Sequence, residues 1–275
     1  MDKIIVPVDF SEYSEYALEA AASLARNNQA EILALHMLEL SEDSLTSSDN
    51  EQQAQAVFFL KMAEKKFNEF LERDYLKDVK VIPIVKHFKV FSEVSDVAEN
   101  HSADLIVMGS HGTSGISEFF VGSNTERVVR HSKVPVLVIK NKPENLQFNH
   151  VVFACNFSDE VSEAYKKVKS MFKNSKLSVL YVNTPTDSFK STTQIENRVN
   201  EFLQKADGNL DSLNLVNYVS DYSVEDGVLS FANKVNADLI ITPTHGRTGI
   251  AHFFEGSISE DIANHAGIPV MTFKI

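Results

Sequence analysis

The sequence predicts a duplicated α/β fold, with two tandem doubly wound domains that are each built on a five-stranded parallel sheet. The length of 275 residues accommodates two domains of ~100–200 residues. Residues 104–129 and 238–263 are identical at 12 of 26 positions when they are aligned at an offset of 134. In both halves, apolar strand-like runs alternate with helical patterns, which indicates a parallel sheet covered by helices on both faces.

The first half opens with an apolar run over 3–9 that ends in an acid, the signal of a buried strand. Ser11 is a suitable helix N-cap, and Glu12 and Glu15 in the first turn suit the helix dipole. The other elements expected in this half are strands over 31–38, 79–85, 104–109 and 135–140 and helices over 92–101 and 122–132. A long helix precedes the third strand, because apolar residues recur there at three- and four-residue spacing: Ala56, Phe59, Leu60, Ala63, Phe67, Phe70 and Leu71.

The second half repeats this order after a polar segment over 141–149 that contains a proline and is typical of a linker. Its strands are expected at 150–155, 176–182, 213–219, 238–243 and 268–274, and its helices near 159–173, 192–207, 224–235 and 256–266. We therefore expect one domain over 1–142 and another over 148–275.

Composition excludes several classes of protein. The formal net charge of −12 argues against nucleic acid and anionic membranes as partners, since nucleic-acid binders normally carry a basic face. No apolar run reaches the ~18–20 residues that span a bilayer, and the amino-terminal segment lacks the layout of a signal peptide, so we expect a cytoplasmic protein. Cys155 is the only cysteine, which rules out an intrachain disulfide and a cysteine-based metal cluster.

The segment GSHGTSGISEFFVGS over 109–123 has the features of a phosphate cradle. Glycines let backbone N–H groups approach an anion, and the start of the following helix offers unpaired N–H groups and a positive dipole end. Ser123 and Thr125 can add hydroxyl donors, and Asp9, at the end of the first strand, can accept from an adenine amino group or a ribose hydroxyl. Ordinary turn glycines and a common helix cap would give a similar pattern. The segment is neither a P-loop nor GxGxxG.

These motifs resemble those of the universal stress protein (UspA) superfamily in its tandem form, over essentially the whole chain. Its ATP-binding subgroup carries the pattern G-2x-G-9x-G-(S/T), found here as Gly109, Gly112, Gly122 and Ser123. VPVDFSE, LALHML, MGSHG and VPVLVIK are also typical of that family. The resemblance implies a Rossmann-like, adenine nucleotide alpha hydrolase-like sheet with strand order 3-2-1-4-5 and ATP held between the ends of its first and fourth strands.

The resemblance also assigns contacts and partners. Asp9 matches the aspartate that contacts adenine, Met37 falls where the backbone meets that base, and Ser123 is a candidate ligand for a Mg²⁺ ion held by the ATP phosphates. The implied nucleotide-binding residues are Pro7, Val8, Asp9, Met37, Met108, Gly109, His111, Gly112, Gly122, Ser123, Asn124 and Thr125. Pairing of the two domains through their fifth strands and association of two chains are further implications.

The second copy of the loop, PTHGRTGIAHFFEGS over 243–257, departs from the pattern. Pro243 replaces Gly109 and lacks a backbone N–H, and Asn156 replaces Asp9 and carries no charge. Gly246, Gly256, Ser257 and Ser259 are retained. Losing a hydrogen bond to a charged group costs ~1.5–3 kcal/mol, about 10- to 150-fold in affinity. We therefore expect one working ATP site, in the first half.

The function expected is nucleotide-dependent regulation or sensing in a stress response, with ATP as a conformational ligand. A nucleotide-independent scaffold with vestigial clefts, and a slow ATPase or autophosphorylating protein, are the alternatives. No Gly-x-Ser-x-Gly elbow is found, and Asp9 at the adenine end is badly placed as a base for phosphoryl transfer. The nine histidines show neither HxxxH nor HxH spacing, so no metal site made of protein ligands is expected.

Overall fold

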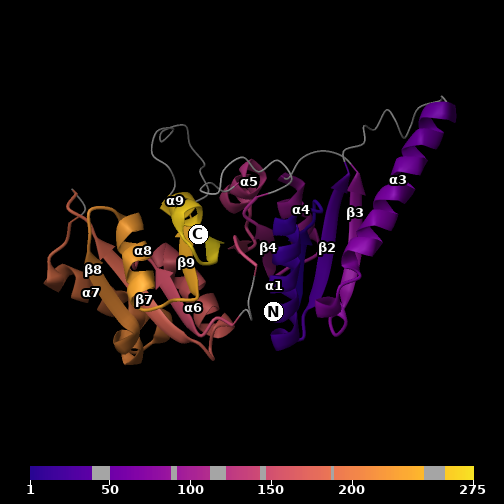
Figure 1. Cartoon of the computed structure of the whole chain (residues 1–275). Coiled ribbons are helices and arrows are strands. Elements are labelled where there is room, and N and C mark those ends of the chain that lie inside the picture. The colour runs from indigo at the N-terminus through magenta and orange to yellow at the C-terminus, as the bar shows by residue number, and fades with distance from the viewer. Residues whose placement is uncertain (39–49, 88–91, 112–121, 143–146, 187–188, 245–257) are drawn as a thin grey trace. The chain divides into compact units, whose positions relative to one another are not determined.

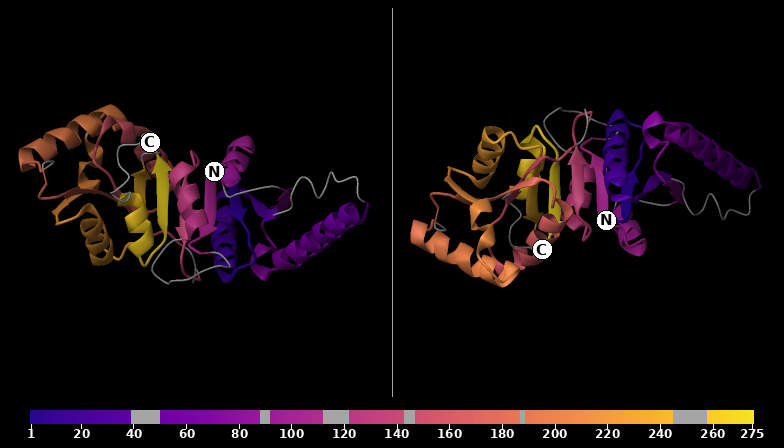
Figure 2. Two further views of the ribbon diagram at one scale, coloured as in Figure 1. Left: turned by 90° about the horizontal axis from the view of Figure 1, so that it is seen from above. Right: turned by 90° about the horizontal axis from the view of Figure 1, so that it is seen from below.

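A computed structural model describes residues 1–38, 50–87, 92–111, 122–142, 147–186, 189–244 and 258–275 (Figure 1). The chain divides into two compact units, Met1–Leu146 and Gln147–Ile275. Helices lie on both faces of the sheet in each unit (Figure 2). The prediction of an α/β fold is therefore confirmed. Within each unit, the neighbouring strands pair in parallel.

Unit 1 contains a parallel sheet in the order β3-β2-β1-β4-β5. Its strands are β1 (Lys3–Pro7), β2 (Glu31–Leu38), β3 (Val81–His87), β4 (Leu105–Gly109) and β5 (Val136–Ile139). Its helices are α1 (Glu12–Asn28), α3 (Asn50–Leu71), the 3₁₀ turn η1 (Asp74–Leu76), α4 (Ser92–Asn100) and α5 (Ser123–His131). Pro83 lies in β3, at the edge of this order, where a missing ladder donor is tolerated.

Unit 2 repeats the plan in the order β8-β7-β6-β9-β10. Its strands are β6 (His150–Ala154), β7 (Lys176–Asn183), β8 (Val216–Ser220), β9 (Leu239–Thr244) and β10 (Val270–Lys274). Its helices are η2 (Asp159–Val161), α6 (Ser162–Met171), α7 (Thr192–Asp207), η3 (Asp211–Leu215), α8 (Val224–Lys234) and α9 (Ile258–His265). The strand expected over 213–219 begins three residues late, because its first apolar residues form the 3₁₀ turn η3.

Two apolar layers sandwich the sheet of unit 1. On one face, α4 and α5 pack on the strands through a cluster of buried residues: Ile5, Leu33, Leu35, Val94, Val97, Ala98, Ile106, Met108, Val128, Val129, Val134, Val136 and Val138. Since strand side chains alternate between faces, Ile4 and Val6 point to the other face, where α1 contacts β1 and β4. No helix in the described part of the chain is long and apolar enough to cross a membrane.

The apolar face predicted for helix α3 is only partly buried. Phe67 and Phe70, in its carboxyl-terminal part, are buried, whereas Phe59 and Met62 are more than half exposed. Figure 1 shows the reason, since the amino-terminal part of α3 extends past the ends of β2 and β3. The apolar spacing predicted the helix correctly, but it could not show where the sheet beneath the helix ends.

Candidate functional site

The candidate site lies at the carboxyl ends of β1 and β4. β1 pairs with β2 on one side and with β4 on the other, so the strand order reverses between β1 and β4. The register between these two strands covers Ile4↔Leu105 and Ile5↔Ile106 and stops short of both carboxyl ends. Ligands of open α/β sheets bind in the crevice at such a switch point.

Asp9 is part of the turn that leads from β1 into α1. Its Oδ1 accepts hydrogen bonds from the Ser11 backbone N at 3.0 Å and from Ser11 Oγ at 2.5 Å. Ser11 caps α1 by accepting from the Ser14 N, and Phe10 between them has a left-handed backbone with φ of 65°. The half-buried carboxylate of Asp9 is therefore held in place by the turn, at the mouth of the crevice.

Gly109, at the end of β4, has no Cβ because α1 occupies the space. A Cβ there would lie 2.6 Å from the Tyr13 backbone O and 2.7 Å from its backbone C. The structure shows that this glycine admits the first turn of α1, and its approach to a ligand stays a prediction. Thr125, which is buried on α5, donates from Oγ1 to the Gly109 carbonyl at 2.8 Å. Both helices of the site are thus anchored at this one residue.

The start of α5 is held against the end of β4. The Gly122 N donates to the Ser110 carbonyl at 2.6 Å, and the Ser110 N donates to the Ile139 carbonyl at 2.9 Å. Gly122 is the N-cap of α5 and provides no side-chain cap, so first-turn N–H groups of α5 keep the capacity to bind an anion. Ser123 is exposed and Asn124 is half-buried in this first turn. Gly112 lies outside the described residues.

His111 presents a buried nitrogen next to this helix start. Its Nδ1 lies 2.9 Å from Ser110 Oγ, and its ring centroid lies 5.0 Å from that of Tyr13. Its Nε2 is buried and has no hydrogen-bond partner among the residues that the structure describes. Leaving a buried polar atom unpaired costs ~1–3 kcal/mol, so a polar group of a ligand at this position would be stabilising.

The remaining predicted residues are apolar and lie in or against the core at the carboxyl ends of β1, β2 and β4. Pro7 and Val8 are buried at the end of β1. Met108 belongs to the core cluster beneath α4 and α5, and the partly buried Met37 packs against it. All predicted site residues that the structure describes therefore lie at the carboxyl edge of the sheet or in the first turn of α5 beside it: Pro7, Val8, Asp9, Met37, Met108, Gly109, His111, Gly122, Ser123, Asn124 and Thr125. Of these, Thr125 would have to give up its bond to Gly109 to donate to a phosphate.

Sequence reasoning missed Tyr13, Ser110 and His36. His36 is buried, and because a carbonyl can only accept, its Nδ1 donates to the Val8 carbonyl at 2.8 Å. Burial lowers the pKa of His36 below its ordinary value of 6.5. The ring of Phe10 lies 4.4 Å from that of His36 between centroids. The matching residue of the second half, Phe157, also has a positive φ. The recurrence of phenylalanine at this position in both halves could therefore have indicated the turn from the sequence.

The matching edge of unit 2 is built differently. Asn156 Oδ1 accepts from the Ser158 N at 2.9 Å, which reproduces the turn of Asp9 without the charge. On α8, a Cβ at Gly227 would lie 2.6 Å from Val182 Cγ1. Val182 is the counterpart of Met37. The backbone N of Val8 donates to the Leu35 carbonyl, and the backbone N of the matching Cys155 donates to the Leu180 carbonyl. Met37 and Val182 each lie two residues after these acceptors. His245, Gly246, Gly256 and Ser257 lie outside the described residues, as does the side chain of Ser259.

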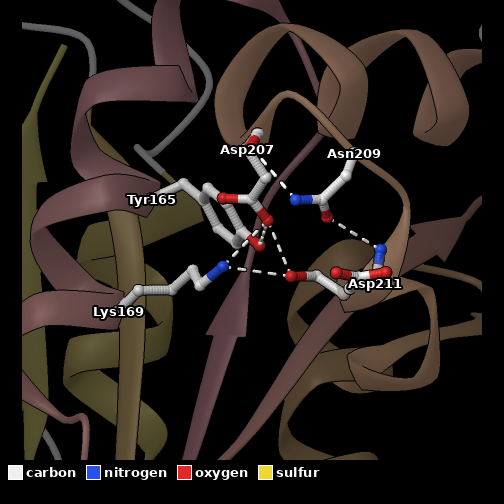
Figure 3. A network of polar contacts seen from close by, with 6 residues as sticks. Tyr165, Lys169, Asp207, Asn209 and Asp211 are labelled. Carbon is white, nitrogen blue, oxygen red and sulfur yellow. Dashed lines mark hydrogen bonds and ion pairs between the residues drawn. The ribbon is translucent and has the colours of Figure 1, made fainter.

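A polar cluster in unit 2 joins α6, α7 and η3, and Figure 3 shows it from close by. Asp207 Oδ2 accepts from Tyr165 Oη at 2.9 Å, from Lys169 Nζ at 2.8 Å and from Ser212 Oγ at 2.6 Å. Lys169 Nζ also donates to Ser212 Oγ at 3.0 Å. Burial opposes the charge of Lys169, but the hydrogen bond to Asp207 raises its pKa above the ordinary value. A lysine that stays protonated cannot act as a base toward Ser212, so the cluster is structural.

Cys155 and the acidic and histidine side chains are also candidate functional groups. Burial raises the pKa of the Cys155 thiol to about 12, which suppresses the reactive thiolate. No group of three or more His, Cys, Asp and Glu side chains among the described residues could hold a metal ion.

Comparison with known proteins adds the family. The model of the universal stress protein family matches residues 1–140 and 147–274. The universal stress protein MJ0577 of Methanocaldococcus jannaschii is 32% identical over 155 residues, which are 51% of this chain and 95% of that protein. The universal stress protein YxiE of Bacillus subtilis is 29% identical over 153 residues, 50% of this chain and 99% of that protein.

A solved structure shows a similar fold over the full length. The crystal structure of a universal stress protein from Archaeoglobus fulgidus covers 99% of this chain and 96% of its own, with a TM-score of 0.69 and 22% identity. At that identity the likeness concerns the fold alone.

Proposed function

The chain belongs to the universal stress protein family, and we propose that its first domain, residues 1–142, binds ATP with Mg²⁺ as a nucleotide-dependent regulator of a stress response. One observation carries this proposal. Three features lie together where the strand order of unit 1 reverses: Asp9 after the end of β1, Gly109 at the end of β4, and the start of α5, which has no side-chain cap.

The residues present fit the chemistry of the nucleotide. The Asp9 carboxylate would accept from the adenine amino group, with the Met37 backbone on the same base and Pro7, Val8 and Met108 as its apolar surroundings. The first-turn N–H groups of α5, with Ser123 and Asn124, would bind phosphate oxygens, and Ser123 is the candidate protein ligand of Mg²⁺. His111 Nε2, which lacks a partner among the described residues, supports a polar ligand group at this end.

We propose regulation in preference to catalysis, because the Asp9 carboxylate lies at the proposed adenine end and is badly placed as a base for phosphoryl transfer. A ligand shifts a conformational equilibrium only through its differential affinity for the two states. Gly109 links the first turn of α1 to α5, so a nucleotide bound there would stabilise one arrangement of the two helices. Pairing of the domains through β5 and β10, association of two chains and a cytoplasmic location complete the proposal.

We propose further that the domain over 148–275 has lost this site. Two features of unit 2 support the loss beyond Asn156 and Pro243. The β6–β9 register reaches Phe153↔Ile241, one pair further toward the carboxyl edge than the β1–β4 register. Gly227 brings α8 onto Val182, whereas Glu93 occupies the matching position on α4 at the offset of 134. Both features reduce the space that an adenine ring would occupy at this edge of the sheet.

Binding of Mg·ATP by calorimetry tests the proposal, with Asp9→Asn and Asn156→Asp as matched variants. The turn at Asn156 shows that an amide sustains this backbone, so Asp9→Asn should fold normally. We expect a loss of about 10- to 150-fold in affinity for Asp9→Asn, because it removes a charged acceptor. Asn156→Asp should leave the affinity unchanged. Binding that is insensitive to Asp9→Asn, or absent from the wild type, would contradict the proposal and favour a nucleotide-independent scaffold.

A further inference from the structure

Helix α3 continues an apolar face beyond the core that it helps to build. Phe59, Met62, Ala63 and Lys66 follow the same spacing that leads to the buried Phe67 and Phe70. Phe59 is 57% exposed and Met62 is 51% exposed. Helix α7 of unit 2 has 16 residues against 22 in α3, and its apolar residues Ile195, Val199, Phe202 and Leu203 are all buried. The uncovered part of α3 is therefore a feature of the first half.

A pocket of about 670 Å³ lies beneath this part of α3. Its lining residues come from the end of β1, from β2 and from α3: Phe10, His36, Leu38, Phe59, Met62, Ala63, Lys65, Lys66 and Glu69. The size falls within the ~300–1,000 Å³ of small-molecule sites. Five of the nine lining residues are aromatic or aliphatic, His36 comes from β2, and the charged side chains Lys65, Lys66 and Glu69 all come from α3.

Lys66 gives the pocket a positive charge for which the described residues supply no ion-pair partner. Lys65 Nζ lies 3.8 Å from a carboxylate oxygen of Glu69. Lys66 Nζ lies 4.3 Å from the centroid of the Phe10 ring, and it has no carboxylate partner among the residues that the structure describes. Burial lowers the pKa of the neighbouring His36, an effect that outweighs the hydrogen bond to the Val8 carbonyl and the nearby Asp9 carboxylate, which both raise it. Charge and lining together select a ligand with a long apolar body and one anionic group.

This pocket is separate from the proposed nucleotide site. His36 and Met37 are neighbours on β2, so their side chains point to opposite faces of the sheet. Met37 packs with Met108 under α4 and α5, whereas His36 lies against Phe67 of α3 with 5.7 Å between ring centroids. A ligand in the pocket would occupy the α3 face and would leave the Met37 face free.

We propose that this pocket binds a long-chain monocarboxylate such as a fatty acid. The alkyl chain lies along Leu38, Phe59 and Met62, and the carboxylate pairs with Lys66 at the pocket edge. Burial of the chain supplies most of the affinity, at about fourfold for each buried methylene. Lys66 distinguishes the acid from an uncharged chain of the same length.

Calorimetric titration of the full-length protein with monomeric laurate and with dodecanol tests the proposal. We expect laurate to bind one per chain and dodecanol to bind about tenfold more weakly, near the lower end of what a hydrogen bond to a charged group contributes. Lys66→Met should lower laurate affinity about tenfold and leave dodecanol unaffected. Lys61→Met, an exposed lysine of the same helix that does not line the pocket, is the matched control and should change neither.

Met62→Glu tests the apolar part of the pocket. This side chain is half exposed, so the variant should fold, and it should abolish binding of both probes. The proposal is overturned if laurate does not bind, if dodecanol binds as tightly as laurate, or if Lys66→Met has no effect. It is also overturned if sedimentation shows chains that associate through this face, with Met62→Glu monomeric and laurate excluded from the associated form.

Discussion

The two halves of the chain begin their first helices at different places. In unit 1, α1 begins at Glu12, directly after its cap Ser11. At the offset of 147 the matching residue of unit 2 is Asp159, yet residues Asp159–Val161 form the 3₁₀ turn η2 and α6 begins only at Ser162. The sheets share one strand order, so the difference is confined to the edge where the proposed site lies.

The matching strand ends carry different residues, Gly109 in unit 1 and Pro243 in unit 2, and we infer that this exchange contributes to the difference. The first turn of α1 lies so close to β4 that a Cβ at Gly109 would overlap the Tyr13 backbone. A proline in place of Gly109 would overlap the first turn of α1 in the same way. Unit 2, which has Pro243 at the matching residue, forms the 3₁₀ turn η2 where α1 has its first helical turn. We infer that the residue at this strand end limits where the first helix can begin. The strand order is the same in both units, although β6 and β9 pair one position further than β1 and β4.

The largest expected effect comes from giving Gly109 a side chain. Gly109→Ala should destabilise unit 1 by about 3 kcal/mol, the upper end for overpacking, because the Cβ meets backbone atoms that cannot rotate away. Hydrogen exchange of the β4 and α1 amides measures the loss. Gly267→Ala is the control, since a Cβ there meets nothing within 4 Å. Equal effects of the two changes would show that α1 is free to retreat and would break the comparison.

Next in size is the polar cluster of unit 2, which has no counterpart in the matching residues of α1, Leu18 and Ala22 at the offset of 147. Asp207→Ala should destabilise unit 2 by about 2 kcal/mol, because Tyr165, Lys169 and Ser212 lose a shared charged acceptor. Urea denaturation followed by exchange of the α6 and α7 amides would measure it. Asp211→Ala, a nearby exposed carboxylate, should change stability by less than about 0.5 kcal/mol.

The same cluster gives unit 2 an acid transition. Burial opposes ionisation of Asp207, but hydrogen bonds from Lys169, Ser212 and Tyr165 outweigh it and hold its pKa below the ordinary 3.8. The stabilisation is therefore complete above pH 3.8 and is lost as the pH falls through the lower folded-state value. The acid unfolding midpoint of unit 2 should rise in Asp207→Ala. An unchanged midpoint would mean that other carboxylates control the transition.

A smaller pH effect of the same sign concerns His36 in unit 1, whose place is taken by Tyr181 in unit 2. The folded-state pKa of His36 lies below its unfolded value of 6.5, so the native state binds this proton less readily. The stability of unit 1 should be full above about pH 6.5 and should decline as the pH falls below it. His36→Tyr should flatten that slope in thermal melts recorded from pH 7 to pH 5. A slope that persists in the variant would assign it to other groups.

Much of the fold could be predicted because its signals are local. The apolar runs placed β1, β2 and β4 within one or two residues, and Ser11 is the cap that its residue type suggested. The candidate site followed from spacing, since parallel strands bring their carboxyl ends together. Contacts across the fold had no such signal. Neither the approach of Tyr13 to Gly109 nor the bond from His36 to Val8 is encoded within a window of neighbouring residues. The exposed face of α3 depends on where β2 and β3 end, which periodicity does not report.

The nucleotide content of the chain tests the central claim most directly. The protein is soaked with Mg·ATP, desalted and denatured, and the released nucleotide is quantified by chromatography for the wild type, for Asp9→Asn and for the double variant Asn156→Asp with Pro243→Gly. The account predicts about one ATP per chain in the wild type, little in Asp9→Asn and still one in the double variant. Two ATP per wild-type chain, or one that persists in Asp9→Asn, would contradict it.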